Sequence, residues 1–349
     1  MNRFMMLGVL TLGVVCGGVA HAATGQRVVV PVRQETVKSG GIRYSVSISI
    51  GHTRLRAMLD TGSTGIRILP GATSPSDLTP TQQDASYSYS SGVKLTGVLA
   101  NALVAVGNLR GTQPISIDDV THVGCIRGRP HCAASRVSQQ AYRLGGRGNR
   151  GFKAIMGISL APSTAVNPLP AIGAPTWILI LPKPGDTQPG SLILNPNPAD
   201  LAGFTDFQLN TSRKPIQALP GCLVNLRSNQ KVCAPTILDS GTMSVNVKMP
   251  SNNQGLSFTR GDQAQFTFKG RAGSVPPATF TVTARGLTRV SVKIKQAKHG
   301  QPPTSIMGGI LPYFSYDVLY DSGSKVIGLK PRMPARGEIL QHMEHGPLH

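Results

Sequence analysis

The chain has 349 residues, of which 40% are hydrophobic and 14% charged, so it can bury a sizeable core and is neither disordered nor a coiled coil. Its 40 glycines and 27 prolines indicate many short elements joined by turns, which excludes a long helical bundle. Lys and Arg outnumber Asp and Glu by 35 to 15, for a formal net charge of +20, so carboxylates are scarce. At roughly 150 residues per domain, the length allows one large or two modest domains.

The first 22 residues have the pattern of a signal peptide. Arg3 precedes an uncharged apolar run over 4–20, and Ala20-His21-Ala22 is a small-x-small cleavage signal. We therefore expect export by the secretory route, with cleavage after Ala22, to the periplasm or the outside of the cell. No later apolar run approaches the roughly 20 residues of a spanning helix, so no transmembrane segment is expected after processing.

Strand patterns dominate the rest of the chain. Residues 44–50 alternate polar and apolar side chains with a period of two, and several later segments do the same. Short helical patterns occur only at 137–144 and 309–314. The segments predicted as strands are 44–50, 98–106, 176–181, 191–194, 265–268, 279–283 and 290–294. The pattern predicts an all-β protein, and the length predicts two lobes.

Proline-rich sequence over 182–198 interrupts the strand pattern and marks a domain boundary. We expect an N-terminal lobe over 23–188 and a C-terminal lobe over 189–330. The last residues, 331–349, lack an apolar period and are predicted to form a flexible tail.

Four cysteines remain after the expected cleavage, in two pairs that are close in sequence. In an oxidising compartment, local disulfides Cys125–Cys132 and Cys222–Cys233 are the economical interpretation. The alternative is a zinc site, but the spacings are too wide for a Cys-x(2–4)-Cys motif and no His pair flanks them. We therefore expect no metal.

Two short motifs each occur twice, in the same order. Leu-Asp-Thr-Gly-Ser at 59–63 recurs as Leu-Asp-Ser-Gly-Thr at 238–242, and Ile-Met-Gly follows at 155–157 and at 306–308. The first motif predicts a strand that delivers a carboxylate into a tight turn, where Gly adopts dihedrals closed to other residues and hydroxyls hold the carboxylate oxygens. In a chain with so few acids, two such turns indicate a common purpose for the two carboxylates.

These motifs resemble those of the pepsin-like aspartic peptidases, in a bacterial, secreted and uncharacterised branch. In that family each of two β-barrel-like lobes supplies one Asp-Thr/Ser-Gly loop and a later apolar-apolar-Gly segment beside it, with the active-site cleft between the lobes. The resemblance covers nearly the whole chain: 89–97 is similar to the flap hairpin, and 154–158 and 306–311 to the Gly segments. It implies a monomeric hydrolase, an aspartic endopeptidase acting on proteins or peptides.

The resemblance makes Asp60 and Asp239 the catalytic pair. Two carboxylates about 3 Å apart cannot both ionise cheaply, so one keeps its proton. The ionised member would take a proton from a water that attacks the scissile carbonyl, while the protonated member would bond the developing oxyanion. The two titrate as a unit, so which one holds the proton stays open. This chemistry needs no cofactor.

The residues around each Asp receive supporting roles from the same resemblance. The hydroxyl residue directly after each Asp would make hydrogen bonds between the lobes, and the one two places later would bond the outer carboxylate oxygen. Ordinary turn hydroxyls are the alternative. The supporting set is Thr61, Gly62, Ser63, Ser240, Gly241 and Thr242.

The flap shows departures from the family. The resemblance makes Tyr89 and Gly92 part of a flap that closes over substrate, but Tyr87 and Tyr89 both lie on an alternating strand, where a packed tyrosine is the alternative. The only tryptophan is Trp177, so the one that commonly backs the flap tyrosine is missing. Arg67 stands where an apolar or aromatic residue is usual and is expected near the cleft.

Two long stretches, 121–185 and 263–316, hold no acid at all. Such basic patches favour an anionic surface polymer as a further partner, with an unengaged basic surface as the alternative. No specific nucleic acid is expected, since no aromatic platform lies between the charges. The alternative function is a catalytically idle module of the same fold that binds peptides or anionic envelope polymers; a purely structural envelope protein would leave the paired carboxylates unexplained.

Overall fold

The computed structural model describes residues 25–37, 41–146, 150–209, 217–250, 255–270, 273–283, 291–296 and 305–332. The expected signal peptide and residues 333–349 of the expected tail lie outside these ranges. The first half of the described chain holds β1 (Val28–Thr36), β2 (Ile42–Ile50), β3 (Thr53–Asp60), β4 (Thr64–Ile68), β5 (Thr79–Ser88), β6 (Val93–Ala102), β7 (Val104–Val106), β8 (Leu109–Arg110), β9 (Ile115–Cys125), β10 (Ala154–Ile158), β11 (Thr176–Ile180) and β12 (Gly190–Leu194).

The second half holds β13 (Thr205–Gln208), β14 (Leu219–Asn225), β15 (Gln230–Leu238), β16 (Val245–Met249), β17 (Gln263–Gly270), β18 (Gly273–Ser274), β19 (Ala278–Thr281), β20 (Val292–Gln296), β21 (Ser305–Gly309), β22 (Tyr316–Asp321) and β23 (Val326–Pro331). The described helices are single turns: 3₁₀ turns η1 (Pro75–Asp77), η2 (Ala133–Arg136) and η3 (Leu311–Phe314), with α1 (Pro168–Ala171) and α2 (Pro198–Leu201). The predicted all-β class is therefore confirmed.

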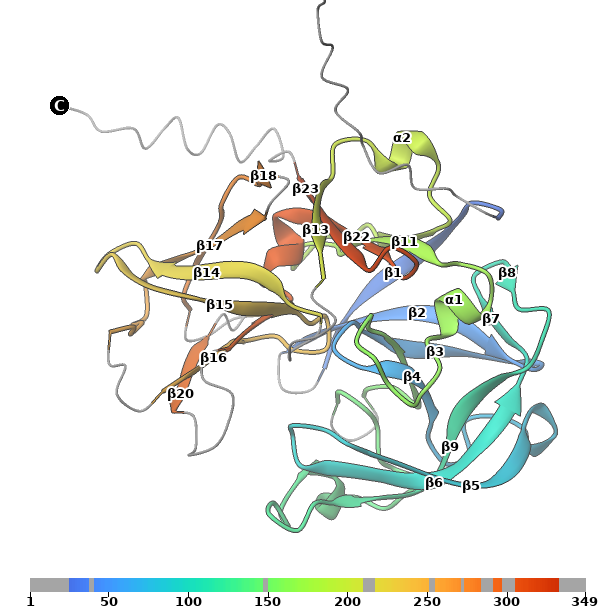
Figure 1. Cartoon of the computed structure of the whole chain (residues 1–349). Coiled ribbons are helices and arrows are strands. Elements are labelled where there is room, and N and C mark those ends of the chain that lie inside the picture. Colours follow the sequence, from blue (N-terminus) through green and yellow to red (C-terminus); the bar gives the residue numbers. More distant parts are fainter. Residues whose placement is uncertain are drawn as a thin grey trace, which may run out of the picture.

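The strands form two sheets, and the predicted bilobal arrangement is confirmed. Figure 1 shows β14 to β17 and β20 on one side of the molecule, and β2 to β9 on the other. A six-strand antiparallel run, β13-β23-β22-β11-β12-β1, continues from the first lobe's sheet. The lobe boundary expected between 188 and 189 falls between β11 and β12, which pair with each other, so the division of the chain stays a prediction.

Each lobe contains the same five-strand arrangement. In the first lobe the order is β2-β3-β10-β4-β9, and in the second it is β14-β15-β21-β16-β20. Successive pairs run antiparallel, parallel, antiparallel and parallel in both. The repeat in the sequence is thus a repeat of topology. It places the end of β3 and the end of β15 in equivalent positions.

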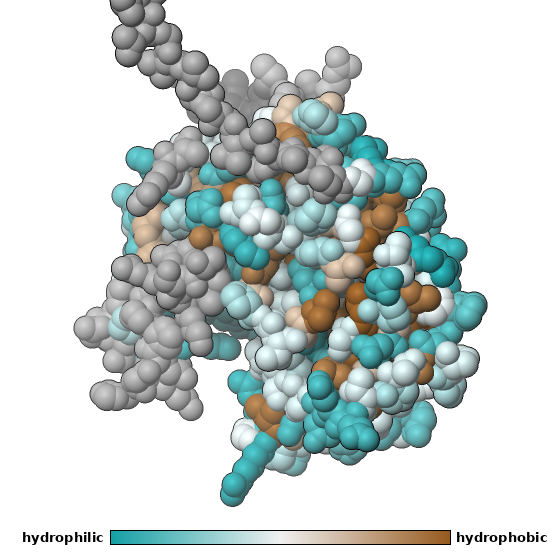
Figure 2. Space-filling model, turned by 45° about the vertical axis from the view of Figure 1, so that its right-hand side comes forward, coloured by the Kyte–Doolittle hydropathy of each residue, from teal (hydrophilic) through white to brown (hydrophobic). Residues whose placement is uncertain are grey.

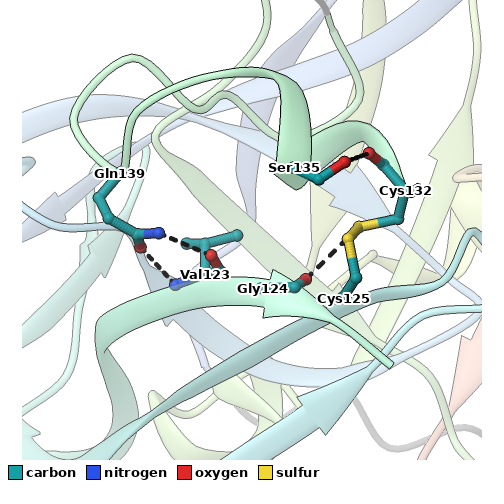
Figure 3. Close-up of a disulfide and its surroundings, with 6 residues drawn as sticks. All are labelled: Val123, Gly124, Cys125, Cys132, Ser135 and Gln139. Carbon is teal, nitrogen blue, oxygen red and sulfur yellow. Dashed lines mark hydrogen bonds between the residues drawn. A yellow bond between two sulfur atoms is a disulfide. The ribbon is translucent and has the colours of Figure 1, made fainter. Parts of the chain in front are cut away.

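The helix expected over 137–144 is wrong. The chain there forms turns, because Gln139 bonds both backbone groups of Val123 on β9 and Leu144 pairs with Phe152. Figure 3 shows the Gln139 amide against Val123. These long-range contacts outweigh a weak local helical pattern. The pattern over 309–314 becomes only the single turn η3, because Gly309 ends β21 with a positive φ of 62°.

Both predicted disulfides are confirmed. Cys222–Cys233 joins directly paired residues of β14 and β15. Cys125–Cys132 joins the end of β9 to the residue before η2, so it closes a small loop at that edge of the first lobe (Figure 3). Among the described helices, none is long and apolar enough to cross a membrane.

The described surface has no large continuous apolar area on the face seen in Figure 2. There the brown hydrophobic residues lie in separate groups among teal hydrophilic ones. The exposed large hydrophobic side chains of the described residues lie far apart in the sequence, two in strands and three in connecting segments: Val29, Leu103, Val166, Leu226 and Ile294. Scattered residues of this kind are usual on a soluble surface and mark no docking face.

Trp177 anchors the strands that join the lobes. It is fully buried on β11, and its ring stacks on that of Tyr320 on β22 at 5.6 Å between centroids. Its indole nitrogen has no hydrogen-bond partner among the described residues, so its contribution is packing alone.

We expect Trp177→Ala to lower the free energy of unfolding by about 3–5 kcal/mol, because it leaves a large cavity in the core. Trp177→Phe serves as the matched control, with a loss of about 1–2 kcal/mol, because fewer buried atoms are removed and no hydrogen bond is lost. Urea unfolding followed by circular dichroism measures both. Equal losses in the two variants would contradict a packing role.

Candidate active site

The first Asp loop begins where β3 ends and folds back on its own carboxylate. The Gly62 amide donates to Asp60 Oδ1 at 2.9 Å, and the Ser63 hydroxyl donates to Asp60 Oδ2 at 2.5 Å. Asp60 is 6% exposed. A carboxylate removed from water needs such donors, and here both of its oxygens have one from within the loop.

The second loop, after β15, repeats this arrangement atom for atom. The Gly241 amide donates to Asp239 Oδ1 at 2.8 Å, and the Thr242 hydroxyl donates to Oδ2 at 2.7 Å. Asp239 is 7% exposed. Ser63 and Thr242 thus hold equivalent oxygens in the two loops, which is the geometry that the resemblance implied.

Reciprocal hydrogen bonds join the two loops. The Thr61 amide donates to Ser240 Oγ at 3.0 Å, and the Ser240 amide donates to Thr61 Oγ1 at 2.9 Å. Each hydroxyl then donates across the lobes, from Thr61 to the Leu238 carbonyl at 3.1 Å and from Ser240 to the Leu59 carbonyl at 2.9 Å. Both side chains are buried, so these four bonds form away from competing water.

The glycines allow the two carboxylates to approach. A Cβ placed on Gly62 would lie 2.6 Å from Asp239 Cγ, and one on Gly241 would lie 2.7 Å from Asp60 Oδ1. Each carboxylate therefore packs against the glycine of the opposite loop. Any larger residue there would force the loops apart.

The Ile-Met-Gly segments lie beside the Asp loops. Gly157 on β10 is in parallel register with Asp60, and Gly309, directly after the second motif, pairs with Leu238. A Cβ on Gly157 would lie 2.6 Å from the Ser63 carbonyl. The second motif is thus a strand that supports the back of each loop.

Burial and the charge of the neighbouring Asp60 raise the pKa of Asp239 to about 7. The bonds from Thr242 and Gly241 favour the ionised form and oppose this shift without cancelling it. The arrangement therefore keeps a proton on the pair at mildly acidic pH. One ionised and one protonated carboxyl group is the state that can both accept and donate a proton to a water between them.

Two further residues hold Thr61, and no local pattern in the sequence predicts either. The Gln217 amide donates to the Thr61 carbonyl at 2.6 Å, and the Tyr313 hydroxyl lies 2.8 Å from Thr61 Oγ1. The Tyr313 hydroxyl also lies 2.5 Å from that of Tyr320. These residues are distant from Thr61 in sequence and carry no motif.

The carboxylates open into a cavity of about 450 Å³ that both lobes line. The first lobe contributes the tip of the β5–β6 hairpin, and the second contributes Met307 and the second loop. The residues around it are Arg43, Met58, Asp60, Gly62, Ser63, Tyr87, Ser88, Tyr89, Ser90, Ser91, Val93, Ala133, Tyr142, Leu144, Gly145, Gly146, Asp239, Gly241, Thr242 and Met307. A concave site with convergent polar groups is the usual form of a ligand-binding cleft.

Both candidate flap tyrosines line this cavity, in different surroundings. Burial raises the pKa of Tyr87, while the charge of Arg67 and a hydrogen bond with Ser63 oppose the shift. The Tyr89 hydroxyl is buried and has no hydrogen-bond partner in the described part of the chain. The rings of Tyr87 and Tyr89 pack edge to face, with 4.8 Å between centroids.

Arg67 lies behind Tyr87, as expected from its position near the cleft. It is 1% exposed, and its guanidinium carbon sits 3.6 Å from the centre of the Tyr87 ring. Its Nε lies 3.1 Å from an Asp118 carboxylate oxygen on β9, and its NH2 donates to the Thr64 carbonyl at 2.9 Å. Asp118 neutralises the buried cation, which then supports the aromatic face.

The hairpin tip is fastened to the disulfide loop. Gly92 closes the turn with a φ of 93°, and its amide donates to the Tyr89 carbonyl at 2.9 Å. The Ile126 amide, directly after Cys125, donates to the Gly92 carbonyl at 2.9 Å, and the Arg129 guanidinium donates to the Ser90 carbonyl. The Cys125–Cys132 loop therefore determines where the tip lies.

No protein-family model matches the chain, and no curated protein matches it in sequence. Among the solved structures that do match is an aspartic proteinase from Irpex lacteus, with a TM-score of 0.57 over 88% of this chain and 97% of that one. The chain has the fold of a pepsin-like aspartic proteinase. At 16% sequence identity, this likeness concerns the fold alone. In the described residues, no three His, Cys, Asp or Glu side chains gather as a metal site would require.

The pair should make stability depend on pH. Because folding raises the pKa of Asp239 to about 7, the stability due to its proton is present in full below about pH 4 and is lost as the pH rises through 7. We expect Asp239→Asn, which has no proton to lose, to be more stable than the wild type near neutral pH and above, by on the order of 1 kcal/mol or more. Urea unfolding over this pH range measures the difference.

The exposed Asp84 on β5 offers the control, since Asp84→Asn removes one carboxylate outside the pair. Its stability should follow that of the wild type at every pH. If the free energy of unfolding of Asp239→Asn changed with pH as that of the wild type does, the raised pKa would be contradicted.

Proposed function

We propose that this protein is an aspartic endopeptidase, which hydrolyses peptide bonds with a water activated between Asp60 and Asp239. One observation carries the proposal: two buried carboxylates, each bonded by its own loop, are locked against each other at the base of a cavity lined by both lobes. An isolated buried carboxylate is costly, and a pair is costlier still. This costly arrangement is explained if the two carboxyl groups share a proton and activate a bound water.

The reaction uses the pair without a covalent intermediate. The ionised carboxylate accepts a proton from the water as its oxygen attacks the scissile carbonyl. The protonated carboxyl group donates a hydrogen bond to the oxyanion that develops, and a proton then passes to the leaving nitrogen. Ser63 and Thr242 orient the carboxylates from outside, so that their free faces meet the substrate.

The hydrogen bonds between Thr61 and Ser240 fix the distance between the two carboxyl groups. Proton transfer requires both carboxyl groups to reach one water, which only a rigid junction between the lobes ensures. The hairpin tip with Tyr87, Tyr89 and Gly92 closes the other side of the cavity and excludes bulk water. Gly62 and Gly241 have the role of letting the carboxylates touch.

The substrate is a protein or peptide, and the enzyme acts as a monomer without cofactor. The two disulfides fit an oxidising compartment, which supports export directed by residues 1–22 to the periplasm or beyond. The basic character of the chain makes an anionic surface polymer a second partner, which would keep the enzyme near the envelope. No specific binding of nucleic acid is proposed.

Substituting either member of the pair should abolish cleavage. We expect Asp60→Asn and Asp239→Asn each to lower the rate on a denatured protein at acid pH by about a hundredfold to ten-thousandfold, because the general acid–base pair is broken. Pepstatin, an inhibitor of aspartic peptidases, should inhibit the wild type.

Asp84→Asn is the matched control and should cleave at the wild-type rate. Cleavage that survives in both pair variants would show a contaminating peptidase and contradict the proposal. A folded wild type that binds peptides without cleaving them at any pH would instead support the catalytically idle module.

The roles of the Tyr87 and Tyr89 hydroxyl groups can be distinguished by replacing each tyrosine in turn with phenylalanine. We expect Tyr87→Phe to lower kcat/KM about three- to tenfold, because the cavity loses a polar group beside the carboxylates while the ring remains on Arg67. Tyr89→Phe should change kcat/KM little, because its hydroxyl has no partner to lose. Steady-state kinetics on one peptide measures both. The opposite order would give Tyr89 the flap role predicted from the sequence.

A further inference from the structure

One cation lines the cavity beside the carboxylates and has no role in the mechanism above. Arg43 lies near the start of β2, and its NH1 donates to the Ile42 carbonyl at 2.8 Å. Its Nε is buried and has no hydrogen-bond partner in the described part of the chain. A buried donor without an acceptor is destabilising, so a ligand that supplies one would be bound favourably.

Arg43 is held in place by packing. A Cβ on Gly145, whose φ is 67°, would lie 2.7 Å from Met58 Sδ and 3.2 Å from Arg43 Nε. The side chain therefore runs along a glycine that leaves just enough space for it. A guanidinium fixed in this way loses little further freedom on binding.

No acid within the described ranges forms an ion pair with Arg43. Glu35 is opposite it in the β1–β2 register, but its carboxylate bonds Ser45 Oγ at 2.6 Å and Arg56 NH1 at 2.9 Å. Burial lowers the pKa of Arg43, and the charges of Asp239 and Asp60 oppose this shift. The pair with its shared proton carries one negative charge, and neither of its carboxylates forms an ion pair with Arg43.

We propose that Arg43 binds an acidic side chain of the substrate, so that the cleft selects peptides with Asp or Glu near the scissile bond. This rests on the proposed function of the cleft as a peptide site. A carboxylate is the ligand that matches a guanidinium best, because two parallel N–H donors meet two oxygens. It would also give the buried Nε its acceptor. Arg67 cannot take this role, since it does not line the cavity and its guanidinium is paired with Asp118 and packed on Tyr87.

The net charge of +20 favours the same class of substrate at longer range. A basic molecule raises the local concentration of acidic peptides before any specific contact forms. This long-range field acts on every acidic peptide alike. A contact with Arg43 acts at one position of the peptide only, and this difference can be measured.

The test measures binding in a chain that does not cleave. Asp239→Asn protein is titrated into labelled eight-residue peptides, acetylated and amidated at their ends, that differ by a single Glu or Gln placed in turn at each central position. We expect Glu to bind about tenfold or more tightly than Gln at one position, by fluorescence anisotropy. Arg43→Met in the same background should remove this preference, and Arg43→Lys should keep part of it.

Arg54 provides the matched control, because it is exposed on β3 outside the cavity and Arg54→Met removes the same charge. The Arg54→Met variant should prefer Glu over Gln as strongly as the Asp239→Asn protein does. The fluorescence of Trp177, the only tryptophan, reports whether each variant is folded. A Glu preference that survives Arg43→Met, or that Arg54→Met removes equally, would overturn the proposal, as would equal binding of Glu and Gln at every position or no binding at all.

The experiment separates this proposal from the proposed function. A wild type that fails to cleave contradicts the peptidase, while the binding preference is still measured. A wild type that cleaves Gln and Glu peptides equally contradicts the role of Arg43 alone. A companion set of peptides with a free carboxyl terminus tests the other source of a carboxylate. If only that set shows a contribution of Arg43 to binding, Arg43 binds the terminus, and the acidic side chain is excluded.

Discussion

The whole site depends on the reciprocal hydrogen bonds between Thr61 and Ser240. Each residue uses its amide and its hydroxyl on the opposite loop, so that neither loop can move without breaking bonds in a buried region. Gln217 and Tyr313 hold Thr61 from two further directions. The junction between the lobes is thus specified by hydrogen bonds of fixed direction rather than by apolar packing, which would tolerate sliding.

That junction makes an otherwise unfavourable arrangement of charge persist. Two carboxylates are buried side by side, and the cost of their burial and of their repulsion appears as a raised pKa for Asp239. The glycines at 62 and 241 allow the contact, and the loop hydroxyls limit the penalty. Structure and chemistry are coupled here, because the same loops that stabilise the fold create the proton affinity that a peptidase requires.

The two arginines of the cleft show how a basic chain uses its charge locally. Arg67 is neutralised by Asp118 and supports the Tyr87 ring, so it acts as a substitute for an aromatic support. Arg43 has no ion pair within the described ranges and lines the cavity, which Arg67 does not. One cation is thus part of the framework, while the other is available to a ligand. The surface charge surrounds both but selects nothing by itself.

The strand content, both disulfides and the two Asp loops could be predicted from the amino-acid sequence, because each depends on local rules: alternation, close cysteine spacing, and a motif that occurs twice. Tertiary structure alone decided the turns over 137–144, the placement of Gln217 and Tyr313 on Thr61, and the seat of Arg43 beside Gly145. These are contacts between residues far apart in the chain. Their energies arise only once the lobes have packed, so no local pattern encodes them.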